Sequence, residues 1–205
     1  CHSMPLLFLI LAEELETEAF WCFSPSHSFI KFQDKQNRWY NIELTQGAVV
    51  TDDFYMNSGF IKSKAIQTGI YLNPRTMKQT IAHMLNDLSA YYISCYGYDH
   101  FIEENSNLVL RYSPSDLTAY QHYANICTVQ AQYVIDACGR PPKEQLPEYP
   151  QAHRLFKKML QSYEKIDSLG YEEMPAEIYH NWLKQVDKAK TLPENQPSPI
   201  IQIKK

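Results

Sequence analysis

The sequence lacks any apolar run long enough to cross a membrane as a helix. A spanning helix needs ~20 apolar residues, whereas the apolar run 6–12 is short and is followed at once by Glu13 and Glu14. An excess of charge of one sign is also missing, because 23 acidic and 19 basic residues give a net charge of −4. Neither a membrane span nor a nucleic-acid surface is therefore expected.

The cysteines lack the spacing of a disulfide framework or a zinc site. Their number is odd and no Cys-x-x-Cys pair occurs; they are Cys1, Cys22, Cys95, Cys127 and Cys138. The histidines other than His27 are far apart, without the spacing of metal ligands. No metal or organic cofactor is expected. A content of 44% hydrophobic and 20% charged residues is ordinary for a globular chain.

Cys1 stands before a segment with the pattern of a helix. Pro5 is tolerated in a first helical turn, and the apolar run 6–12 follows it. The unpaired N–H groups and the dipole at a helix start favour a thiolate. A small buried side chain is the plain alternative. An N-terminal-nucleophile hydrolase would start on a strand and a lipoprotein anchor would continue as a flexible linker, so neither fits. A chain starting at Cys1 rather than Met favours a fragment or processed product.

Three short aromatic and β-branched runs predict antiparallel strands at 18–23, 28–32 and 38–45. The polar residues between the last two runs predict a hairpin turn centred on Lys35. A turn centred there places His27 opposite Glu43 on one face of the sheet, with Asn41 one diagonal step away. The register therefore predicts a carboxylate or an amide beside the imidazole.

These residues resemble the transglutaminase-like branch of the papain-type thiol fold. The resemblance covers residues 1–72 and depends on a Cys at a helix start, a His on a following strand, and a Trp-x-x-x-Asp/Glu-x-Thr strand. That strand reads Trp39-Tyr40-Asn41-Ile42-Glu43-Leu44-Thr45. The resemblance implies Cys1 as nucleophile, His27 as base and Glu43 as the third, orienting member of a triad.

The sequence departs from that family at two points. The family usually has Asp at the third position, where this chain has Glu43, so Asn41 is the alternative orienting residue. The family's oxyanion-hole side chain normally precedes the nucleophile, and nothing precedes Cys1 in this sequence. Backbone N–H groups at the helix start are the remaining candidates for that role.

Helical patterns dominate from residue 73 onward. The predicted helices span 74–96, 99–111, 115–137, 151–168 and 175–190. An apolar stripe supports the first helix, and His83 at its flank is expected at the surface. Asp52 and Asp53, before this region, are expected in a solvated turn. Segment 108–114 resembles the end of a tetratricopeptide helix pair, but unequal helix spacing argues against a regular array.

The sequence thus predicts an α+β protein: a transglutaminase-like core at 1–72, an all-α extension of helical hairpins at 73–190 and an extended tail at 191–205. The expected activity is thiol-dependent acyl transfer, most simply hydrolysis of a peptide or amide bond in a peptide or protein substrate. The alternative is a non-catalytic protein that binds a peptide or protein partner through its helical region. The sequence does not indicate a compartment.

Overall fold

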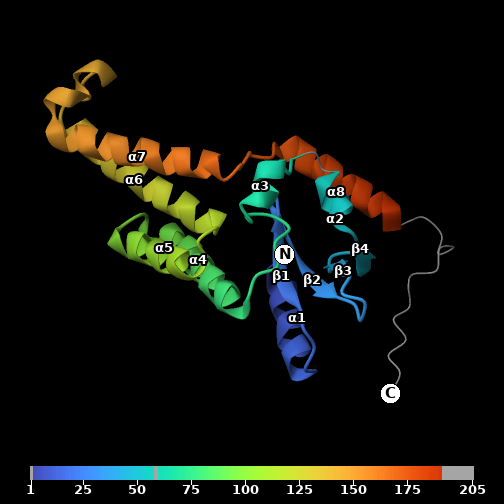
Figure 1. The fold of residues 1–205 in the computed structure, drawn as a ribbon. Coiled ribbons are helices and arrows are strands. Elements are labelled where there is room, and N and C mark those ends of the chain that lie inside the picture. Colours follow the sequence, from blue (N-terminus) through green and yellow to red (C-terminus); the bar gives the residue numbers. More distant parts are fainter. Residues whose placement is uncertain (1, 58–59, 191–205) are drawn as a thin grey trace. The chain divides into compact units, whose positions relative to one another are not determined.

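The computed structural model describes residues 2–57 and 60–190, with the backbone alone for residues 183 and 185–190. The chain forms two compact units. Figure 1 colours the chain by residue number, so each unit contains segments of different colours. Unit 1 comprises residues 1–61, 71–74 and 173–205, and unit 2 comprises residues 62–70 and 75–172. The predicted α+β class is confirmed, since a four-stranded antiparallel sheet accompanies a larger content of helix.

Unit 1 is built around that sheet, whose strands lie in sequence order. Its elements are α1 (Ser3–Glu14), β1 (Phe20–Ser24), β2 (His27–Gln33), β3 (Trp39–Glu43), β4 (Ala48–Val50), α2 (Asp52–Met56) and α8 (Ala176–Lys190). Helix α1 contributes Leu9 to a core with Trp21 and Ile30 on one face of the sheet. Side chains alternate along a strand, so His27 and Phe29 face the other side, where Tyr55 of α2 stacks on Phe29 with the ring centroids 4.0 Å apart.

The β2–β3 register differs by two residues from the predicted one. Lys31 pairs with Asn41 and Phe32 with Tyr40, so the turn is centred on Gln36 rather than Lys35. The side chain of Asp34 sets this turn, because its carboxylate accepts hydrogen bonds from the backbone N–H groups of residues 36 and 38. A shift of two residues keeps every side chain on its predicted face. His27 and Glu43 are therefore diagonal neighbours on one face instead of direct partners.

Unit 2 is helical, and each of its long helices packs against the next one along the chain (Figure 1). Its elements are α3 (Ser63–Gln67), α4 (Met77–Tyr96), α5 (His100–Tyr112), α6 (Leu117–Ala137), the 3₁₀ helix η1 (Lys143–Glu148) and α7 (Pro150–Ser168). Helix α4 begins three residues after the expected Pro74, because Thr76 and Gln79 form a capping box there. The starts of α5 to α8 lie within two residues of the predicted ones. None of the described helices combines the length and hydropathy that a membrane span needs.

Two expectations about polar residues are wrong. His83 is 2% exposed rather than on the surface. It faces into unit 2 because the carboxylate of Asp116 accepts a hydrogen bond from its ring. Asp52 does not lie in a solvated turn but begins α2, where it pairs with the ammonium group of Lys31. In both cases a buried polar partner accounts for the position of the side chain.

Candidate catalytic site

A histidine and a glutamate meet in the buried part of unit 1. His27 begins β2, directly after the two-residue turn from β1, and Glu43 ends β3. The imidazole Nε2 lies 2.7 Å from Oε2 of Glu43, and the two side chains are 2% and 1% exposed. With Nε2–H donating to the carboxylate, Nδ1 is the ring nitrogen with a lone pair to accept a proton.

Glu43 accepts hydrogen bonds from other residues besides His27. Its Oε1 accepts hydrogen bonds from the Thr45 hydroxyl at 2.5 Å and the Thr45 backbone N–H at 3.1 Å. Its Oε2 also accepts one from the Tyr55 hydroxyl at 3.0 Å. Burial by itself would raise the pKa of Glu43, but the hydrogen bond and charge of His27, with the hydrogen bonds from Thr45, outweigh it and hold this pKa below its usual value. The carboxylate is therefore ionised and fixed in orientation.

Tyr55 stays neutral beside this carboxylate. Burial raises the pKa of the Tyr55 hydroxyl far above its ordinary value, and the negative charge of Glu43 raises it further. The phenol is thus a permanent hydrogen-bond donor to Glu43. Its ring also lies near that of His27, with centroids 6.2 Å apart. The sequence pattern did not indicate Tyr55 or Thr45 as members of the site, although Thr45 belongs to the strand motif.

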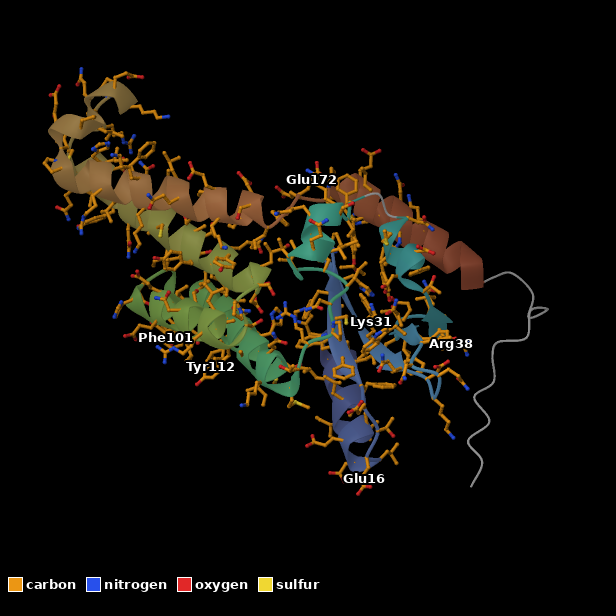
Figure 2. The ribbon with its side chains drawn as sticks, in the orientation of Figure 1. Glu16, Lys31, Arg38, Phe101, Tyr112 and Glu172 are labelled. Atoms are coloured by element: carbon orange, nitrogen blue, oxygen red, sulfur yellow. The ribbon has the colours of Figure 1, made fainter. Side chains whose placement is uncertain are left out.

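Asn41, the alternative orienting residue, has a different partner. Its amide nitrogen donates to Oδ1 of Asp52 at 2.8 Å. The buried ammonium of Lys31, a residue labelled in Figure 2, donates to both oxygens of the same carboxylate at 2.9 Å. Lys31 also donates to the carbonyl of Leu72. This second polar cluster joins β2, β3 and α2 on the face that carries His27. A lysine beside Phe29 and Ile30 on a buried strand was the signal that could have indicated it.

An aromatic side chain from the far end of the sequence covers the imidazole. The ring of Trp182 on α8 approaches that of His27 edge-on, at 5.5 Å between centroids. Next to it is a cavity of about 10 Å³, lined by Ser24, Pro25, Tyr55, Met174 and Trp182. Such a volume holds about one water molecule. Trp182 must therefore move before a substrate can reach His27.

Cys1 lies outside the described residues, but its neighbour is described. The ring of His2 contacts Trp21 and Phe23 of β1, with centroids 5.3 and 6.1 Å away. Phe23 pairs with Ser28, the residue after His27. The start of α1 is therefore at the same end of the sheet as His27, although the body of α1 packs on the opposite face. Of the predicted triad, the structure brings His27 and Glu43 together and does not describe Cys1.

Unit 2 contains a further buried polar cluster that the sequence pattern did not predict. Asp116, the N-cap of α6, accepts hydrogen bonds from Arg75, His83 and Asn86 and from the backbone N–H of Ala119. Burial would raise the pKa of Asp116, but the hydrogen bond from His83 and the charge of Arg75 hold it well below its ordinary value. The signal was present in part, since Asp116 stands at the start of the predicted helix 115–137.

Comparisons with protein-family models, curated proteins and solved structures found no match for this chain. Within the described residues, no group of three or more His, Cys, Asp or Glu side chains is arranged to hold a metal ion. The chemistry of the site therefore follows from its own residues. A base fixed by a buried carboxylate can accept and return a proton, provided that an acid such as a thiol meets it.

Proposed function

We propose that the protein is a thiol-dependent acyl-transfer enzyme of the transglutaminase-like type, with Cys1 as nucleophile, His27 as base and Glu43 as orienting group. The observation that carries this proposal is the 2.7 Å hydrogen bond between Nε2 of His27 and the buried, ionised Glu43. A carboxylate in this position fixes the tautomer of the imidazole and stabilises its protonated form. Nδ1 is then the atom that exchanges a proton with the thiol.

The reaction proceeds in two stages. The Cys1 thiol gives its proton to Nδ1 of His27, and the thiolate attacks the carbonyl carbon of an amide. The C–N bond breaks, the amine leaves with the proton from His27, and a thioester remains on Cys1. Water, losing a proton to His27, then attacks the thioester and releases a carboxylic acid and the free thiol. A lysine amine in place of water would give a cross-link, and we favour hydrolysis.

The sheet imposes a condition on this mechanism. Helix α1 packs on the face of Trp21 and Ile30, whereas His27 and Glu43 share the other face. The thiol must therefore meet the imidazole at the end of the sheet, beside the turn between β1 and β2. The ring contact between His2 and Phe23 supports a start of α1 at this end.

The first experiment is the pH dependence of alkylation of Cys1 by iodoacetamide, followed by peptide mass spectrometry on the full chain. A free thiol titrates near pKa ~8.5, and pairing with histidine lowers this by several units. We expect rapid labelling of Cys1 at pH 6, lost in His27→Ala and slowed in Glu43→Gln. The exposed Cys95 provides an ordinary thiol in the same sample, and His100→Ala changes an exposed histidine as the matched control.

An ordinary labelling profile of Cys1 that neither substitution changes would refute the triad. The second candidate would then be a non-catalytic protein that binds a peptide or protein partner through its helical region. The cover of Trp182 over His27 and the small cavity beside it favour this candidate, because they leave no room for a substrate in the described conformation.

A further inference from the structure

Helix α4 carries its large apolar side chains on the outside. The exposed fractions are 47% for Met77, 58% for Ile81, 42% for Met84, 48% for Leu88 and 70% for Tyr91. Cys95, one turn further on, is also exposed. Monomeric soluble proteins rarely expose a contiguous apolar surface of this size without a function for it.

The opposite side of α4 is polar and small, yet it is the side that packs into unit 2. Its buried residues are Thr80, Ala82, His83, Asn86 and Ser89. Their polar groups have partners on other helices: His83 and Asn86 bond to Asp116, and Ser89 receives a hydrogen bond from Asn105. These hydrogen bonds compensate for burial. The packing of unit 2 therefore accounts for the inward face of α4 and leaves its apolar face unexplained.

The spacing of the apolar face is that of a coiled coil. Its members follow one another at intervals of four, three, four, three and four residues; they are Met77, Ile81, Met84, Leu88, Tyr91 and Cys95. This alternation is the a/d pattern that packs one helix along another. A helix that lies on a globular core normally has a broader apolar stripe, directed inward.

The stripe is complementary to itself in the antiparallel direction. Consider two antiparallel copies of α4 related by a two-fold axis at the level of Asn86. Met84 then lies opposite Leu88 of the second copy, Ile81 opposite Tyr91, and Met77 opposite Cys95. Each of these layers joins an a position to a d position, as antiparallel packing requires. With ~100 Å² exposed per large side chain, two copies would bury about 1,000 Å² from the stripe alone, the lower limit for a specific interface.

We propose that the chain forms a two-fold dimer in which α4 packs antiparallel against α4 of a second copy. This proposal is independent of the acyl-transfer reaction. The exposed Asp87 flanks the seam next to the two-fold axis, so the two Asp87 carboxylates approach each other. Like charges at such a position oppose association, and Asp87→Asn is expected to tighten the dimer about two- to tenfold.

Sedimentation equilibrium of the full chain over a concentration series tests the dimer. We expect a reversible monomer–dimer equilibrium, with Met84→Glu and Leu88→Glu each raising the dissociation constant at least 100-fold while the far-ultraviolet circular dichroism is unchanged. Tyr133→Glu changes a residue of α6 that is 76% exposed and leaves the dimer intact. A wild-type chain that stays monomeric at several hundred micromolar overturns the proposal, as does a dimer that persists in both Glu variants. Unfolding of these variants also overturns it, since the stripe is then covered within one chain.

Cross-linking tests the direction of packing. Met77→Cys places a thiol opposite Cys95 of the second copy, so mild oxidation should give a disulfide-linked dimer. The same two positions in one chain are 18 residues apart on one helix, about 27 Å, which is too far for an intrachain bond. Met77→Cys combined with Cys95→Ser removes this cross-link. Efficient cross-linking of wild-type Cys95 to itself would show parallel packing and overturn the antiparallel register.

Discussion

Replacing Asp116 by Asn should destabilise unit 2 strongly and leave unit 1 unaffected. The carboxylate is fully buried and accepts hydrogen bonds from Arg75, His83, Asn86 and the backbone of Ala119. Asn has nearly the same shape but no charge, so the guanidinium of Arg75, 8% exposed, is left buried without its counter-ion. Breaking a buried ion pair from one side costs about 3–5 kcal/mol. For a unit of this size such a loss lowers the melting temperature by about 10–20 °C.

The chain allows the two units to be followed separately. Its three tryptophans, Trp21, Trp39 and Trp182, all belong to unit 1, whereas the long helices α4 to α7 of unit 2 dominate the far-ultraviolet circular dichroism. We expect Asp116→Asn to lower the temperature at which the ellipticity is lost. The temperature at which the tryptophan fluorescence changes should stay the same. A loss under 1 kcal/mol, or an equal shift of both signals, would refute the reasoning.

The matched control is Asp136→Asn. Asp136 also pairs with an arginine, but Arg140 lies beyond the end of α6 and the pair is exposed, so its loss should change stability little. The pH dependence is a second check. The pKa of Asp116 is depressed in the fold, so its stabilisation is complete above the unfolded pKa of about 4 and is lost as the pH falls through the folded value. The difference between Asp116→Asn and the wild type should therefore be constant at pH 5–7 and shrink below pH 4.

Three further predictions concern stability. Asp52→Asn removes the counter-ion of the buried Lys31 and should lower the free energy of unfolding by about 2 kcal/mol, measured by urea unfolding with tryptophan fluorescence. This loss is smaller than for a fully buried pair because Asp52 is 41% exposed. An unchanged free energy of unfolding would contradict the role of this pair. Gly170→Ala adds a Cβ 2.7 Å from the backbone nitrogen of Ala65 at a φ of +83°, so circular dichroism should report a loss of about 1–3 kcal/mol, whereas the open Gly139 tolerates the same change with a smaller loss. Glu43→Gln should lower the free energy of unfolding at pH 7. Because the pKa of Glu43 is depressed in the fold, the difference in stability between wild type and variant should diminish as the pH falls below about 4. A difference that grows in acid would contradict an ionised Glu43 in the folded protein.

The helices were predictable because local signals determine them. Asp116 caps α6, Gly97 ends α4, and the starts of α5 to α8 lie within two residues of those predicted from periodicity. The strands of the hairpin were predictable for the same reason. The register was wrong by two residues because it depends on how the Asp34 side chain binds the turn and on a φ of +60° at Asn37, which composition alone does not indicate.

Partners that are distant in the sequence were the main source of error. His83 was expected at the surface because the apolar stripe of α4 was expected to face inward. The structure instead buries the polar face of α4, which carries His83. Only the position of Asp116, 33 residues later, gives His83 a reason to be buried. The proximity of His27 and Glu43 could be predicted by counting residues from the turn, because both lie on one hairpin. A two-residue shift of the strand register keeps them on the same face of the sheet.

The sheet unit is discontinuous along the chain, and this has a consequence for synthesis. The strands that carry His27 and Glu43 leave the ribosome before unit 2, whereas Trp182, which covers the imidazole, follows only after the whole of unit 2. Because chains emerge from the N-terminus at about 5–20 residues per second, the dyad exists for several seconds without its cover in every new molecule. A nascent chain stopped after residue 172 should therefore expose His27 to solvent, which makes the site a reporter of whether translation has passed the helical unit.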